Sequence, residues 1–175
     1  MKTPINLLLI ILFLSFNSCS KEDNCENPID CLPPSTQTGA GTFGCLINGE
    51  PFVDTSGKYN CFYQFVDGGY YFNISGSFDS EIAEVNLGTI DMPIEKGKTY
   101  RLESPISRNA TASLFLGSNL ETLHTGKEFS GELHVTSFDL DSRIVSGTFW
   151  FDVYNPETGK TIRIREGRFD SLFTR

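Results

Sequence analysis

The chain has 175 residues, of which 39% are hydrophobic and 21% are charged. This hydrophobic content excludes a wholly disordered protein, and the length fits a single domain. There are 14 basic and 22 acidic residues, so the formal net charge is −8. So acidic a chain has no general electrostatic attraction for nucleic acid, and we expect no nucleic-acid partner. Its 2 histidines leave few arrangements for His-based catalysis or for a multi-histidine metal site.

Residues 1–18 have the composition of a secretory signal peptide. Lys2 precedes an uninterrupted apolar run from Leu7 to Leu14, and small or polar residues follow. A positive residue, a short apolar segment and a polar stretch before the cleavage point are the features of a signal that is removed. The apolar run is much shorter than the roughly 20 residues that a membrane-spanning helix needs. We therefore predict a signal peptide at 1–18.

The segment Leu14–Cys19 resembles the lipobox of bacterial lipoproteins. The resemblance implies cleavage before Cys19 and attachment of acyl chains to that residue. Several acyl chains on one residue supply the multiple anchors that stable membrane attachment requires. We thus expect lipidation at Cys19, attachment to the outer membrane through this anchor, and contact with the lipoprotein-processing machinery. An ordinary secreted protein with one extra thiol is the alternative.

Four residues directly after the predicted lipidation site form a short charged motif: Ser20, Lys21, Glu22 and Asp23. A lysine followed by two acidic residues at this place resembles the export signal of lipoproteins of Bacteroidota. The resemblance implies that export machinery reads these four residues and that the protein is displayed on the outer face of the outer membrane. A lipoprotein facing the periplasm, with these residues as a solvated linker, is the alternative.

Four cysteines remain when Cys19 carries the lipid, and an even number in an oxidising compartment indicates disulfides. Among the three possible pairings, we favour Cys25–Cys31, which closes a short loop, and Cys45–Cys61, which links two early strands. We expect no metal site, because the chain has no Cys-x-x-Cys pair and no histidine near these cysteines.

Residues 19–41 are polar and rich in turn-forming residues, which predicts a flexible, disordered tether. From Thr42 onward, short segments alternate between apolar and polar residues and are separated by Gly, Asn, Asp and Pro. This pattern predicts an all-β domain at 42–175, an antiparallel meander of about nine or ten strands. Both a β-sandwich and a partly closed, lipocalin-like barrel remain open.

The last two strands can be predicted in more detail, because the segment 155–160 has the composition of a turn. A hairpin symmetric about this turn places Asp152 opposite Arg163 and Trp150 opposite Arg165 on its outer side. The same register would place Glu166 on the inner face, where a charge is costly. We therefore expect a β-bulge at Glu166–Gly167 that restores the inward direction of the residues after it.

Three segments resemble an uncharacterised β-rich domain of Bacteroidota outer-membrane lipoproteins. The segment 38–49 is similar to the opening of that domain, and the segments 147–151 and 166–170 are similar to its close. The resemblance covers the chain from about residue 36 to its end. It implies a β-rich fold and an envelope location, and it offers no activity and no catalytic residues.

The sequence contains no clear catalytic constellation. It has no Gly-x-Ser-x-Gly motif, His124 lies in a turn-rich stretch, and His134 lies on the outward side of a strand. Paired carboxylates are the remaining catalytic option, because glycoside hydrolysis needs two acids in a cleft. The candidates for such a pair are Asp152, Glu157, Glu166 and Asp170. We expect no cofactor, and a non-enzymatic protein is favoured over a carboxylate-dependent glycoside hydrolase.

Aromatic residues are more suggestive, because the segment 59–72 is dense in Tyr and Phe. Most of these rings are expected in the core, whereas exposed rings would form a surface for a glycan or a partner protein. The ligand-binding candidates are Tyr63, Tyr70, Tyr71 and Trp150. The leading interpretation is thus a lipid-anchored binding domain of the cell surface. A lipocalin-like carrier of a small apolar ligand is the second interpretation.

Overall fold

The computed structural model describes residues 25–56, 61–77, 83–117 and 122–175. The predicted signal peptide at 1–18 and five predicted site residues lie outside the described residues: Cys19, Ser20, Lys21, Glu22 and Asp23.

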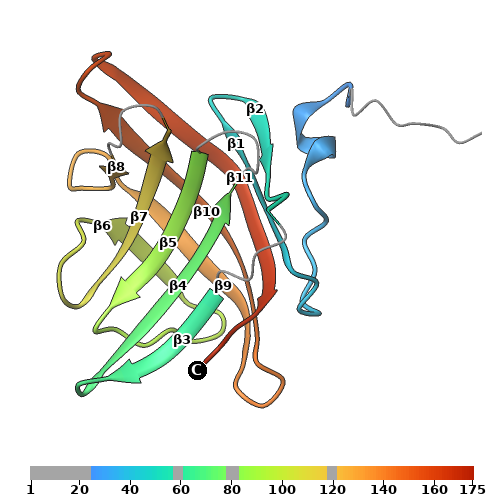
Figure 1. Ribbon diagram of the computed structural model, residues 1–175, viewed down its shortest axis with the longest axis vertical. Coiled ribbons are helices and arrows are strands. Elements are labelled where there is room, and N and C mark those ends of the chain that lie inside the picture. Colours follow the sequence, from blue (N-terminus) through green and yellow to red (C-terminus); the bar gives the residue numbers. More distant parts are fainter. Residues whose placement is uncertain (1–24, 57–60, 78–82, 118–121) are drawn as a thin grey trace, which may run out of the picture.

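The described chain consists of one short 3-10 helix, η1 (Pro28–Cys31), and eleven strands (Figure 1). The first six strands are β1 (Thr42–Ile47), β2 (Glu50–Val53), β3 (Cys61–Val66), β4 (Gly69–Ser77), β5 (Ala83–Ile90) and β6 (Thr99–Glu103). The other five are β7 (Asn109–Leu116), β8 (Thr122–His124), β9 (Gly131–Asp139), β10 (Ile144–Asn155) and β11 (Lys160–Leu172). The predicted all-β class is therefore confirmed, with eleven strands.

All strands belong to one sheet with the order β2-β1-β11-β10-β9-β6-β7-β5-β4-β3, and β8 pairs with β7 beside this path. Most neighbours are antiparallel, as predicted, but β6 and β7 are parallel. The order departs from a simple meander in three places. Strand β1 lies beside β11 at the far end of the chain, β6 lies beside β9, and β7 lies beside β5.

The sheet is strongly curved, so that β3 at one end of the order approaches the chain just after β11 (Figure 1). Phe62 and Thr174 form an isolated parallel bridge. Its backbone hydrogen bonds run from Tyr63 N to Thr174 O (2.8 Å) and from Thr174 N to Cys61 O (3.1 Å). These contacts bring the two ends together, but continuous strand pairing does not close the sheet into a barrel.

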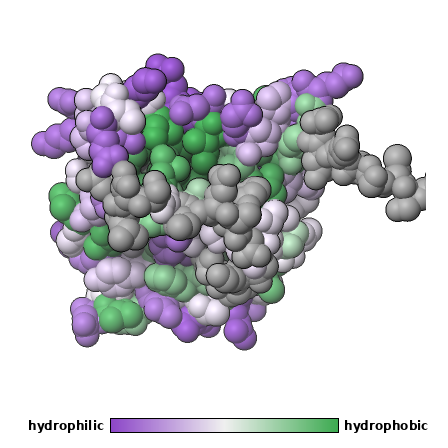
Figure 2. Space-filling view, turned by 45° about the horizontal axis from the view of Figure 1, so that its top comes forward, coloured by the Kyte–Doolittle hydropathy of each residue, from purple (hydrophilic) through white to green (hydrophobic). Residues whose placement is uncertain are grey.

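Aromatic side chains fill the inside of the curved sheet. The ring centroids of Phe43 and Phe149 lie 5.3 Å apart, and those of Phe149 and Phe169 lie 6.4 Å apart. Gly147 makes room for this packing, because a Cβ there would lie 2.7 Å from a ring carbon of Phe169. Figure 2 shows hydrophobic residues gathered on the face turned forward, with hydrophilic residues around them. Burial of the apolar side chains inside the sheet is the main driving force of the fold.

The carboxylate of Asp170, on β11, holds the segment that precedes β1. Asp170 is fully buried. One of its oxygens accepts hydrogen bonds from Thr36 Oγ1 (2.6 Å) and Thr38 N (2.8 Å), and the other from Gly39 N (2.8 Å) and Ser146 Oγ (2.8 Å). Burial would raise the pKa of Asp170, but these donors outweigh it and hold the pKa well below the ordinary value of 3.8.

The structure differs here from the expected disordered tether at 19–41. Besides the contacts with Asp170, Leu32 is buried, and Pro33 packs so closely on Gly44 that a Cβ there would lie 2.6 Å from Pro33 Cδ. In Figure 1 this segment runs beside β1 and β2. The segment 32–40 is thus part of the fold, because a buried anion and apolar contacts hold it in place.

The predicted disulfide Cys25–Cys31 is present and closes the loop that contains η1. The predicted disulfide Cys45–Cys61 is wrong, because both residues are free thiols in the core. Strand β1 pairs with β2 and β11, whereas β3 pairs with β4, so the two cysteines do not lie on neighbouring strands. Burial raises the pKa of each thiol to about 12.

Replacing the buried carboxylate should weaken the whole fold. In Asp170→Asn, an amide N–H₂ group faces donors that now contact a carboxylate oxygen, so we expect a loss of at least about 3 kcal/mol in the free energy of unfolding. Urea unfolding of the chain without its lipid measures this loss. The exposed Asp141→Asn is the matched control, with an expected change within about 0.5 kcal/mol. Equal stability of the two variants would contradict the role given to Asp170.

The same carboxylate should make stability depend on acidic pH. Because the pKa of Asp170 is lower in the folded chain than its ordinary value of 3.8, its stabilisation is complete above that value. It is lost progressively as the pH falls below 3.8 towards the folded-state pKa. Urea unfolding between about pH 2 and pH 7, which covers most of this change, should show a weaker pH dependence for Asp170→Asn than for the native chain.

The two core thiols should be unreactive in the folded protein. At about pH 8 a thiol with so high a pKa contains little thiolate, and burial also blocks access to it. A thiol-disulfide exchange reagent should therefore label neither Cys45 nor Cys61 in the native chain and both in urea. If urea releases no reactive thiol from a Cys19→Ser chain, the two cysteines are joined after all.

Candidate functional site

The outer surface of β9, β10 and β11 carries a groove whose shape depends on a β-bulge. The pairing of β10 with β11 runs from Phe149–Gly167 directly to Phe151–Ile164, so Trp150 faces two residues of β11. Glu166 lies in this bulge with a φ of 53°. A bulge is therefore present at Glu166, as predicted, but its two residues are Arg165 and Glu166, one position earlier than expected, because Gly167 pairs with Phe149. Phe169 beyond it is buried.

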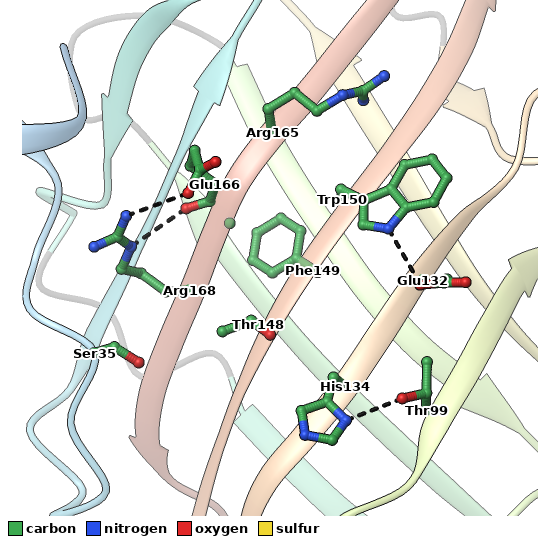
Figure 3. A pocket seen from close by; sticks show the side chains of 11 residues that line it. Ser35, Thr99, Glu132, His134, Thr148, Phe149, Trp150, Arg165, Glu166 and Arg168 are labelled. Atoms are coloured by element: carbon green, nitrogen blue, oxygen red, sulfur yellow. Dashed lines mark hydrogen bonds and ion pairs between the residues drawn. The ribbon is translucent and has the colours of Figure 1, made fainter.

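Gly167 opens the floor of the groove. A Cβ at this position would lie 2.5 Å from two ring carbons of Phe149, so a larger residue does not fit without displacing that ring. The groove has a volume of about 510 Å³, and the Phe149 ring lies beneath it (Figure 3). Its volume lies within the range of ligand sites in proteins, roughly 300–1,000 Å³.

Polar side chains from three neighbouring strands surround this floor. In the pairing of β9 with β10, His134 lies opposite Thr148 and Glu132 lies opposite Trp150. Because both pairs point outward, the four side chains stand side by side on the same face. Ser35, from the segment held by Asp170, also lines the groove. The main lining residues are Glu132, His134, Thr148, Trp150, Arg165 and Arg168.

Trp150 is fixed on two sides. Its indole Nε1 donates a hydrogen bond to Glu132 Oε2 (3.3 Å), and the guanidinium carbon of Arg165 lies 5.3 Å from its ring centroid. The predicted contact between Trp150 and Arg165 is thus confirmed. Asp152 lies opposite Arg163, as predicted. The ion pair of Asp152 is nevertheless formed with Arg165, whose Nη1 is 2.7 Å from Asp152 Oδ1.

The second guanidinium of the groove also has a carboxylate partner. Arg168 Nε donates to the backbone oxygen of Glu166 (3.3 Å), and Arg168 Nη2 lies 3.9 Å from Glu166 Oε2. His134 Nδ1 lies 3.0 Å from Thr99 Oγ1. In Figure 3 these side chains surround the hollow, while both guanidinium groups extend away from its centre. The groove therefore offers an aromatic ring and a mixture of donors and acceptors.

A second cavity, which we call the aromatic cavity, lies beside the β3–β4 and β9–β10 turns and has a volume of about 500 Å³. Its lining includes Tyr63, Phe65, Tyr70 and Leu140. The rings of Tyr63 and Tyr70 are stacked, with centroids 5.2 Å apart and planes inclined by 8°. Burial, with a smaller effect of Tyr70, raises the pKa of Tyr63 to about 12. Phe65 is 63% exposed, so this cavity has an apolar rim.

The four predicted ligand-binding residues are thus divided between two places. Tyr63 and Tyr70 line the aromatic cavity and Trp150 lines the groove, whereas Tyr71 lines neither. Sequence reasoning missed Glu132 and Arg168 as groove residues. The alternation that turns Glu132 outward was visible in the sequence, but the pairing of β9 with β10 in this register was not.

The structure does not bring together the four carboxylates considered for glycoside hydrolysis. Asp170 is buried beneath the N-terminal segment, Asp152 is paired with Arg165, and Glu157 lies in the β10–β11 turn. Glu166 alone among these four lines the groove.

The described residues contain no group of three or more His, Cys, Asp or Glu residues placed to hold a metal ion. In the same parts of the chain, no helix has the length and apolar character needed to cross a membrane.

Comparison with known proteins gives one family. No curated protein and no solved structure matches the chain. The family described as "Domain of unknown function (DUF6252)" matches residues 63–172, which is more than half of the sequence. The matched region runs from β3 to the end of β11 and includes Asp170 and all lining residues of the groove except Ser35. The chain therefore belongs to the DUF6252 family.

Proposed function

We propose that the chain is a lipid-anchored binding protein of the cell envelope, displayed on the outer face of the outer membrane, and that the groove holds its ligand. In this proposal Cys19 carries the lipid and the export machinery reads residues 20–23. The protein performs no catalysis of its own. Its partner is an extracellular glycan or protein.

The location is supported by the N-terminal sequence and by one structural feature. The segment Leu14–Cys19 resembles a lipobox, and the charged motif that follows resembles an export signal of Bacteroidota lipoproteins. The disulfide Cys25–Cys31 supports a compartment outside the cytoplasm, because such bonds form and persist in oxidising surroundings. The two free thiols do not oppose this, since both are buried in the core.

The position of Trp150 is the observation that carries the binding role. This ring is 38% exposed, although a large aromatic side chain gains most when it is buried. Its hydrogen bond to Glu132 and the Arg165 guanidinium beside it hold it at the edge of the groove. A rigid, exposed ring beside a hollow loses little conformational freedom when it contacts a ligand.

The pairing of the charged groups supports binding over catalysis. Glu132 accepts from the indole of Trp150, and Glu166 lies beside Arg168. A glycoside hydrolase needs one protonated carboxylic acid to give its proton to the leaving group. Both carboxylates of the groove are instead engaged with a donor or a guanidinium of the groove itself. Such groups orient a ligand through hydrogen bonds.

The fixed position of the segment 32–40 limits the distance between the domain and the membrane. With the chain in place from Cys25 onward, five residues (20–24) separate the predicted lipidation site from the described structure. The six steps from Cys19 to Cys25 span at most ~20 Å. In this proposal the domain is therefore held close to the membrane surface, with the groove beside the segment that leads to the anchor.

The aromatic cavity supports a second candidate function, the carriage of a small apolar ligand. Phe65, Tyr70 and Leu140 are exposed at its rim, where an apolar molecule would cover them. The inside of the sheet is filled by its own aromatic side chains, so this candidate depends on the cavity at the turns. The groove is favoured because it combines an exposed ring with oriented polar groups.

Protease treatment of intact cells tests the proposed location. The native protein should be cleaved from outside, whereas a variant with Lys21→Ala, Glu22→Ala and Asp23→Ala should be protected, because the export machinery no longer reads it. A variant with Lys127→Ala and Glu128→Ala removes exposed charges that are distant from the anchor in the sequence and should be cleaved like the native protein. Immunoblotting of the cells measures the cleavage.

Two results would contradict the proposal. Protection of the native protein would place it on the periplasmic side of the membrane. Recovery of a Cys19→Ala variant in the membrane fraction, to the same extent as the native protein, would exclude the lipid as its anchor.

A further inference from the structure

We propose that the groove binds a neutral sugar, whose ring stacks on Trp150 and whose hydroxyl groups bond to Glu132, His134 and Thr148. This inference rests on the proposed function, because it specifies the ligand of the same groove.

Trp150 offers the apolar surface that a sugar ring requires. The two faces of a pyranose carry C–H groups, which pack on an aromatic ring, while its edge carries hydroxyl groups. In Figure 3 the indole is seen face-on from the open side of the groove, and no labelled side chain crosses it. Glu132 and Arg165 hold this ring in place. Because the Arg165 guanidinium lies over the ring, a flat apolar group can reach the indole only on the face that Arg165 leaves open.

The polar groups around the ring have bonding capacity left over. Glu132 uses Oε2 for the indole, and His134 uses Nδ1 for Thr99. Among the described residues, Glu132 Oε1, His134 Nε2 and Thr148 Oγ1 have no hydrogen-bond partner. A carboxylate oxygen accepts a hydrogen bond, and a hydroxyl group both donates and accepts. The second imidazole nitrogen donates or accepts according to the tautomer of the ring. Sugar hydroxyl groups both donate and accept, so they match this set.

The charges of the groove favour an uncharged ligand. Arg165 is paired with Asp152, and Arg168 is held by Glu166. Neither guanidinium extends towards the centre of the hollow (Figure 3). The chain as a whole has a net charge of −8, which repels anions. A sugar acid would therefore meet the Glu132 carboxylate without a free cation to offset it, whereas a neutral sugar meets no such repulsion.

The sequence provides a reporter inside the site, because Trp150 is the single tryptophan among the 175 residues. Any change in tryptophan emission therefore reports on the groove. The folded, non-lipidated chain is titrated with neutral oligosaccharides of glucose, galactose and mannose, and separately with an oligosaccharide of glucuronic acid. We expect a saturable change in emission with at least one neutral sugar and none with the acidic sugar at the same concentration.

Variants tie the binding to the groove, with calorimetry as the readout where the tryptophan is removed. Trp150→Ala and Glu132→Gln should each weaken the affinity roughly tenfold or more. Tyr154→Ala removes another exposed aromatic ring, outside the groove, and should bind like the native chain. Circular dichroism of each variant shows whether the fold is retained.

The possible failures can be told apart. If all neutral sugars leave the emission of Trp150 unchanged, the inference is overturned. If the acidic sugar or an extracellular protein changes the emission instead, the groove is still the binding site and the proposed function stands. If a sugar binds the native chain and Trp150→Ala equally tightly, the groove is not the site and both proposals fail. Release of reducing sugar would contradict the non-catalytic role alone.

Discussion

The buried carboxylate of Asp170 is the interaction on which the arrangement of the chain depends. It joins β11 to Ser146 on β10 and to the segment 36–40, which is about 130 residues away in the sequence. A buried charge is tolerated only when donors surround it, and here backbone N–H groups and hydroxyl groups do so. Because an anion without these donors would be costly to bury, the fold requires the N-terminal segment to be in place. The same segment places Ser35 at the groove.

The groove follows from a second constraint on the same strand. Alternation along β11 would direct Glu166 into the apolar interior, and the bulge avoids this at the expense of one ladder pair. The bulge leaves Gly167 over the ring of Phe149, and Arg165 within it lies over the ring of Trp150. A hollow lined by aromatic and polar groups is therefore a result of keeping a charged residue out of the core. The bulge at Glu166 therefore serves both the packing of the core and the shape of the proposed binding groove.

The sequence was sufficient for features that depend on local patterns. The all-β class, the register of Asp152 with Arg163 and the bulge all follow from alternation about a recognisable turn. It was insufficient wherever distant segments meet. The turn-rich composition of 25–41 is the same for a free tether and for a segment bound to Asp170. The absence of a Cys45–Cys61 bond depends on the strand order, and so does the pairing of Glu132 with Trp150. The alternation of apolar and polar residues does not by itself determine the strand order.

The central claim is that Asp170 fastens the N-terminal segment to the sheet, and hydrogen exchange of single backbone amides tests it most directly. Thr38 N and Gly39 N donate to Asp170, so both amides should exchange as slowly as those of β11 in the native chain. In Asp170→Asn they should exchange much faster, under conditions in which the amides of β10 remain protected. Fast exchange of Thr38 and Gly39 in the native chain, at the rate of an unfolded peptide, would contradict the account.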